Sequence, residues 1–155
     1  MKLLLSVTGI AGEVSGNGHS DKLAEMFRGK LKIDDLLVRT FLTPGEWQSG
    51  EIDFEIFKAP AGVSDGEIIA ALDPQIIDRN RIFLALQILQ SRNGSVVLNI
   101  PHGEEEVEVI LGYTEDGCVV YLEHELEGGK DEEYHLHIRP QKTKWKRSVS
   151  VFVVK

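Results

Sequence analysis

The sequence predicts an α+β fold: a mainly antiparallel, twisted β-sheet or partial barrel with one long amphipathic helix (about 74–93) packed on it, and shorter helices near 20–29 and 64–72. Two observations support this prediction. Apolar residues recur with helical spacing in the first of these segments, and after Gly94 the pattern changes to short strands separated by turns. The length of 155 residues suits a single domain, 1–155.

The N-terminal part combines strand and helix signals. Lys2–Val7 is dense in Leu and Val and predicts an opening strand, which a glycine-rich loop follows. Ser20 is a suitable N-cap for a helix that ends near Gly29. Leu36–Leu42 favours β-structure and Ile52–Phe57 alternates apolar and polar side chains, so a hairpin or two neighbouring strands are expected there.

Two helix starts follow in the middle of the chain. Ser64 and Glu67 form a capping box, in which each side chain satisfies a free backbone amide of the first turn. Asp73, followed by a proline at the first helical position, is a second start signal, and Asn93-Gly94 is a C-terminal stop. The wide apolar face between these two signals predicts that the helix packs against a sheet or a partner.

The C-terminal part predicts strands that short turns connect, which favours antiparallel pairing. Their expected bounds are Ser95–Ile100, Val107–Tyr113, Cys118–Leu126, Glu133–Ile138 and Ser148–Val154. The last of them is apolar on both faces. It is therefore expected in the middle of the sheet or at a subunit contact, not at a bare edge.

Composition excludes several classes of protein. Cys118 is the only cysteine, so an internal disulfide and a cysteine-based zinc site are excluded. The first residues lack a cleavage site for a signal peptide, and no run approaches the roughly 20 apolar residues of a membrane span. We therefore expect a cytoplasmic protein, or one that is exported without a cleaved signal peptide, and no membrane partner.

Charge is distributed unevenly along this chain, whose formal net charge is −8. Glu104–Glu133 contains 12 acidic residues and one lysine, whereas Arg139–Lys155 contains six basic residues and no acid. An acidic protein lacks the clustered cations that hold phosphates, so nucleic acid is not an expected partner. The expected interaction surface consists of Glu104, Glu105, Glu106, Glu123, Glu125, Lys142, Lys144, Trp145, Lys146 and Arg147. Core packing is the simpler role for Trp145 and Trp47, although tryptophan is enriched among interface anchors.

The spacing of the histidines and of the acidic residues near them is relevant to metal binding. Alternation along two adjacent strands places Glu123, Glu125, His135 and His137 on one exposed face, with His124 among apolar residues on the other. Two imidazoles with carboxylates suit a divalent metal. A solvated ladder of Glu, His and Arg side chains is the simpler interpretation. No metal site is therefore predicted, and these four residues are the candidates if one exists.

The glycine-rich loop at 9–20 fits neither a Walker loop nor the dinucleotide fingerprint. Its pattern GIxGE at 9–13, with His19 six positions after the glutamate, resembles the opening of the Hcp family, the tube proteins of type VI secretion. The runs KIDDLLVRTF and IDFEIFKA are similar in pattern to the next strands of that family, so the resemblance covers residues 9–59. It implies a β-barrel subunit that stacks into hexameric rings and has no catalytic residues. The pattern after Pro60 departs from that family.

No recognised catalytic constellation is present, so we predict that the protein is not an enzyme and uses no cofactor. The predicted function is a non-catalytic protein-binding or self-assembling subunit, such as a ring- or tube-forming component of a secretion or phage-tail-like apparatus. Its expected partner is a protein, either a second copy in a homo-oligomer or a different chain. One alternative is an acidic inhibitor or immunity-type protein that covers a basic partner surface. The second alternative is a metal-dependent enzyme that uses the strand of His135 and His137.

Overall fold

The computed structural model describes residues 1–11, 27–40, 50–127 and 131–155. Within these ranges the chain forms a seven-stranded sheet of order β1-β3-β7-β4-β5-β6-β2. The strands are β1 (Lys2–Ala11), β2 (Leu31–Ile33), β3 (Gly50–Ala59), β4 (Glu106–Tyr113), β5 (Cys118–Glu127), β6 (Asp131–Pro140) and β7 (Val149–Val154). The helices are α2 (Asp35–Thr40), α3 (Asp65–Leu72), α4 (Arg79–Gln90) and the 3-10 helix η1 (Ser95–Leu98). The predicted α+β class is confirmed.

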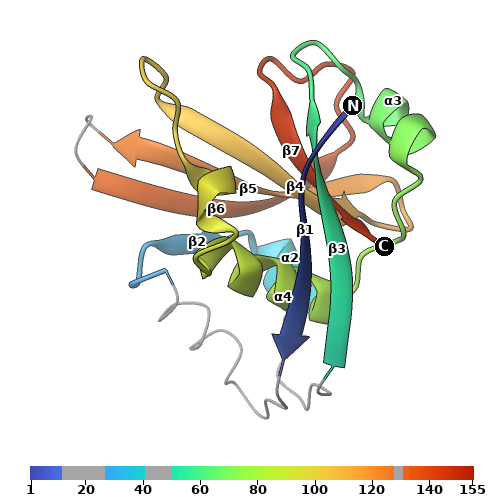
Figure 1. The fold of residues 1–155 in the computed structure, drawn as a ribbon, viewed down its shortest axis with the longest axis horizontal. Helices are drawn as coiled ribbons and strands as arrows, with labels where there is room; N and C mark the ends of the chain where they lie inside the picture. The colour runs from blue at the N-terminus through green and yellow to red at the C-terminus, as the bar shows by residue number, and fades with distance from the viewer. Residues whose placement is uncertain (12–26, 41–49, 128–130) are drawn as a thin grey trace.

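The sheet is mainly antiparallel, as predicted, with parallel pairing only between β4 and β7 and between β2 and β6 among the described strands. It is strongly twisted: β1 and β3 run steeply through the view of Figure 1, whereas β5 and β6 extend to one side. The apolar strand β7 lies between β3 and β4, so its predicted central place is confirmed.

The prediction of one long amphipathic helix at about 74–93 is wrong. α4 begins after Asp78, whose carboxylate accepts a hydrogen bond from the Arg81 amide at 2.9 Å. The residues before it lie along β4 instead, where the Ile77 amide donates to the Tyr113 carbonyl at 2.9 Å. This backbone contact is non-local, so the proline after Asp73 could not reveal it.

α4 is also enclosed on more than one side, since five consecutive residues, Ile82–Leu86, are buried. The predicted stop at Gly94 has a clear steric reason. A Cβ at this position would lie 1.8 Å from the carbonyl oxygen of Ile88, so only glycine fits where the chain turns back over the helix. Figure 1 shows α4 crossing one side of the sheet.

Of three other local predictions, one is confirmed and two are wrong. The predicted helix at 64–72 is confirmed as α3, and its capping box is present. The β-structure expected at Leu36–Leu42 is wrong, because Asp35–Thr40 is helical. The strand expected at Ser95–Ile100 is also wrong, because the packing of Val97 and Leu98 into the core occurs through the 3-10 helix η1. Most of the helix expected near 20–29, like Trp47, lies outside the described residues.

The sheet buries side chains on both faces. One face packs against α4, and the opposite face forms a smaller core with α3. At the centre of this smaller core, Asp65 is fully buried and accepts hydrogen bonds from the Tyr113 hydroxyl at 2.7 Å, the Trp145 indole at 2.8 Å and the Lys142 amide at 2.6 Å. Trp145 is 1% exposed, so its placement on the interaction surface is corrected: it is a core residue that the Asp65 hydrogen bond holds. No described helix is both long enough and apolar enough to cross a bilayer.

Candidate functional site

A polar surface covers β4, β5 and β6 on the side of the sheet away from α4. Side-chain alternation produces it, since every second residue of a strand points to the same face. On β5 this places Glu123 away from α4 and buries His124 on the α4 side at 4% exposure, as the sequence predicts. On β6 the same alternation places His135 and His137 beside Glu123, which pairs with His135 in the strand register.

Asp34 joins this surface from a distant part of the chain and was missing from the sequence prediction. It follows β2, which pairs in parallel with β6, and its amide donates to the Leu136 carbonyl at 3.0 Å. Its carboxylate accepts the Ile138 amide at 3.0 Å. The sequence did contain a signal for this position: consecutive aspartates before Leu36 are typical of a helix start. The prediction of β-structure in that segment hid this signal.

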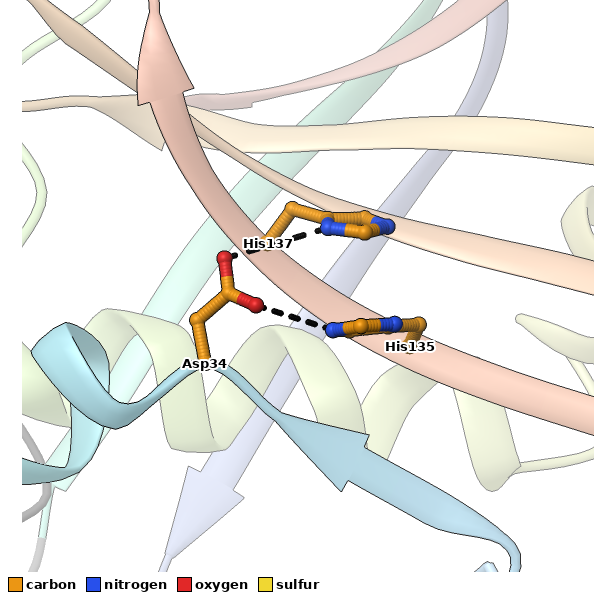
Figure 2. Close-up of side chains that lie close together, drawn as sticks. All are labelled: Asp34, His135 and His137. Atoms are coloured by element: carbon orange, nitrogen blue, oxygen red, sulfur yellow. Dashed lines mark hydrogen bonds and ion pairs between the residues drawn. The ribbon is translucent and has the colours of Figure 1, made fainter.

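The Asp34 carboxylate faces the His135 and His137 imidazoles of β6 (Figure 2) and the Arg139 guanidinium of the same strand. Its Oδ1 lies 2.9 Å from Nε2 of His135. Its Oδ2 accepts a hydrogen bond from the Arg139 guanidinium and lies 3.8 Å from Nδ1 of His137. The two imidazole rings are stacked, with centroids 3.8 Å apart and an interplanar angle of 18°.

His137 is the most enclosed of these groups, because it is 8% exposed and its ring also stacks on Tyr121. Its Nε2 lies 3.3 Å from Oε1 of Glu123, on the side opposite Asp34. Its Nδ1 is buried and has no hydrogen-bond partner among the described residues. The ring therefore stands between two carboxylates, and only one of them is within hydrogen-bonding distance.

The local field sets the protonation states of these groups. Burial, reinforced by the neighbouring His135, Arg139 and Lys142 charges and opposed by that of Asp34, lowers the pKa of His137 to about 4. Burial also acts to raise the pKa of Asp34, but hydrogen bonds from the Ile138 amide and His135, together with the Arg139 charge, outweigh it and hold that pKa below its usual value. At neutral pH the centre thus contains a neutral imidazole at 137 and an ionised carboxylate at 34.

Glu123 belongs to an acidic group on the same surface. Burial, with the hydrogen bond and charge of Glu106 and the charges of Glu125 and Glu108, raises the pKa of Glu123 to about 7. Nearby cations compensate part of this charge: the Arg147 guanidinium bonds the Glu106 carboxylate, and Lys142 Nζ lies 3.7 Å from that of Glu108. Opposite charges that the sequence separates therefore meet within one chain.

Apart from Trp145, which is buried, the predicted interaction residues fall into two groups in the structure. Glu104, Glu105, Lys144 and Lys146 are exposed. Glu106, Glu123, Glu125, Lys142 and Arg147 are partly buried on the polar surface, where Glu106 and Lys142 make the ion pairs described above. Of the predicted metal candidates, His135 and His137 meet at Asp34, whereas Glu125 lies with Glu106 and Glu123 in a separate cluster.

Asp34, His135 and His137 each offer one ligand atom, and these atoms lie within 4.8 Å of one another. Two imidazoles and one carboxylate are a donor set that zinc, iron, nickel and copper accept in proteins. Glu123 bonds the far nitrogen of His137, as outer carboxylates orient histidine ligands in metal sites. Chemically, the centre can hold a divalent cation or exchange protons between its imidazoles and carboxylates.

Comparison with known proteins finds no matching family model, no matching curated protein and no matching solved structure. The resemblance of residues 9–59 to the Hcp family stays a prediction.

Proposed function

We propose that this chain binds one divalent transition-metal ion through Asp34, His135 and His137. The observation that carries the proposal is the position of the His137 ring between two carboxylates. Near pH 8 Glu123, with its pKa of about 7, is mostly ionised, and neutral His137 has one ring proton. Whichever nitrogen carries that proton, the lone pair of the other then faces the carboxylate of Glu123 or of Asp34. A second proton would satisfy both sides, but the pKa of about 4 keeps the ring neutral at neutral pH. A metal ion supplies the missing positive charge.

The tautomer that leaves Nδ1 free suits this role. With its Nε2 proton donated to Glu123, His137 directs the Nδ1 lone pair towards Asp34. His135 donates its Nε2 proton to Oδ1 of Asp34, so coordination through that nitrogen requires the ring proton to move to Nδ1. The stacked rings must also rotate apart, because lone pairs in two parallel planes do not converge on one ion.

Arg139 limits which carboxylate oxygen is available. Its guanidinium and the Ile138 amide both occupy Oδ2 of Asp34, which leaves Oδ1 as the metal-binding oxygen. Since Arg139 holds the carboxylate in place, it acts as a positioning residue for the proposed ligand.

Calorimetric titration of metal-free protein with Zn²⁺ near pH 8 tests the proposal. We expect one ion per chain. Asp34→Asn and His135→Asn should each weaken binding by more than the roughly 10–100-fold that loss of an outer-sphere partner costs. His102→Asn is the matched control, since His102 is exposed on a turn outside the site. Equal affinity in Asp34→Asn and in the control would overturn the proposal.

Self-association is a second candidate function, which one observation favours. β1 is a terminal strand of the described sheet, ten residues long, with Lys2 as its only charged residue. Leu3 and Leu4 beside it are 46% and 42% exposed. A long, apolar edge strand is a template for pairing with another chain. We propose that β1 of a second copy pairs with it.

Light scattering after size-exclusion chromatography tests this second candidate. We expect a dimer that Leu4→Lys converts to a monomer, while Leu36→Lys, at a similarly exposed leucine of α2, leaves it dimeric. A monomer at every concentration of the unmodified protein would refute the edge pairing.

A further inference from the structure

The buried histidine His124 lines a cavity on the side of the sheet opposite the proposed metal site. The cavity has a volume of about 390 Å³ and lies between the end of α4, η1 and the strands β5 and β6. That volume falls within the usual range for small-molecule sites. Its wall combines the apolar side chains of Leu89, Leu98 and Leu126 with His124, Glu132 and Tyr134.

The tautomer of neutral His124 is fixed by its surroundings. Nδ1 lies 2.6 Å from the Leu98 carbonyl oxygen, which only accepts hydrogen bonds, so Nδ1 carries the proton. The ring is held further by stacking on Tyr134, with centroids 4.5 Å apart and an interplanar angle of 8°. Nε2 is therefore an acceptor in the neutral ring.

This acceptor has no donor. Nε2 is buried without a hydrogen-bond partner among the described residues. The residue as a whole is 4% exposed. Its charged neighbour is Oε1 of Glu132 at 3.6 Å, which is itself an acceptor and lies beyond hydrogen-bond distance. Two acceptors that face each other beside a cavity call for a group that donates to both.

We propose that the His124 cavity binds a small primary amine, whose ammonium group donates to Nε2 of His124 and to the Glu132 carboxylate while its apolar body contacts Leu89, Leu98 and Leu126. An ammonium group has three donors and no acceptor, which matches the paired acceptors. A metal ion fits less well, because the cavity offers only these two ligands of the usual kinds, and protein metal sites generally supply three or four.

Binding of benzylamine to the ¹⁵N-labelled full-length protein, compared with toluene, tests the inference by NMR titration. Near pH 8 we expect benzylamine to shift the amide signals of Leu98 and Leu126. Its dissociation constant should be at least roughly tenfold lower than that of toluene, because toluene lacks the charge-assisted hydrogen bonds. The imidazole ¹⁵N signal of Nε2 should shift with benzylamine and stay unchanged with toluene.

Two substitutions complete the test. Glu132→Gln, at a side chain that is 57% exposed, should fold normally and remove most of the preference for benzylamine over toluene. Glu125→Gln is the control, because Glu125 lies on the other face of β5 and should leave that preference intact. Equal dissociation constants for the two probes, unchanged selectivity in Glu132→Gln, or benzylamine shifts confined to residues outside the cavity would each overturn the proposal.

Discussion

Two aspartates that each join distant segments of the chain have different surroundings. Asp65 accepts hydrogen bonds from a tyrosine hydroxyl, an indole and a backbone amide, and is fully buried. Asp34 accepts from a backbone amide, a guanidinium and an imidazole, and its side chain is 14% exposed. Both carboxylates are well bonded, but the donors differ in how readily they lose a proton.

The donors of Asp65 keep their protons at any physiological pH. Burial, with the hydrogen bond and charge of Asp65, raises the pKa of Tyr113 far above its usual value, so this network is permanent. The hydrogen bond that His135 donates to Asp34 is, by contrast, one that the proposed metal ion would replace. In the proposed function, Asp65 stabilises the fold because its donors are fixed, whereas Asp34 contributes to a binding site because its imidazole donor is replaceable.

The largest effect is expected for Asp65→Ala. It leaves the Tyr113 hydroxyl, the Trp145 indole and the Lys142 amide without their acceptor, at roughly 1–3 kcal/mol for each buried group. We expect a loss of about 4 kcal/mol in the free energy of unfolding, measured by urea denaturation. A loss below about 1 kcal/mol would contradict the structural role of Asp65.

Asp34→Ala should cost less stability and more function. The site is partly exposed, so water can replace some of the lost bonds, and we expect a loss of about 1–2 kcal/mol in the free energy of unfolding. Zn²⁺ binding should disappear in calorimetry. If urea denaturation shows that Asp34→Ala costs as much as Asp65→Ala while Zn²⁺ still binds, the contrast between the two aspartates fails.

Glu123→Gln should weaken Zn²⁺ binding moderately, by about tenfold, because the amide orients His137 less strongly than the carboxylate does. In the absence of metal the substitution should stabilise the fold above about pH 7, because ionised Glu123 is unfavourable in the folded state. Glu133→Gln is a suitable control: Glu133 lies 3.8 Å from Lys32 Nζ and belongs to neither proposed ligand set. Calorimetric titrations of the two variants should differ, and identical affinities would argue against an orienting role for Glu123.

The smallest effect concerns the pH dependence of metal-free protein. His137 has a folded pKa of about 4, below the usual 6.5, so the unfolded chain binds more protons between these values and stability rises with pH. Glu123 has a folded pKa of about 7, above the usual 4.5, so the folded chain binds more protons there and stability falls as pH rises. The two slopes oppose each other.

Substitution should separate these slopes. Glu123→Gln leaves the His137 contribution, so the free energy of unfolding should rise between about pH 4 and 6.5, whereas His137→Asn leaves the Glu123 contribution and should reverse the slope. The groups that face them are Glu106, Glu108, Glu125, Asp34, His135, Arg139 and Lys142. Parallel urea-denaturation curves for both variants across this range would show that neither shifted pKa governs stability.

Local sequence patterns were reliable where neighbouring residues decide the structure. The capping box of Ser64 and Glu67 forms, because both partners lie within one helical turn. Alternation along β5 and β6 correctly separates His124 from Glu123, His135 and His137, since strand geometry fixes which face each residue takes. Two of the three proposed metal ligands were therefore predictable.

The third proposed ligand, Asp34, was not predictable from the sequence, because it reaches the site only through the parallel pairing of β2 with β6. The prediction of where α4 begins was wrong for a related reason. The Ile77 amide bonds to β4, and that contact outweighs the helix signal at Asp73. The charge pattern along the chain also did not reveal which opposite charges pair, since Arg147 bonds Glu106 within one chain.

The amino-acid sequence by itself determined the strand alternation, the cap of α3, the central place of β7 and the paired histidines of β6. These features depend on backbone periodicity and on bonds between near neighbours. Only the tertiary structure decided which carboxylate each histidine meets, because Asp34 and Glu132 come into reach through strand pairing and packing. Spacing along a chain carries no information about such encounters until the sheet order is known.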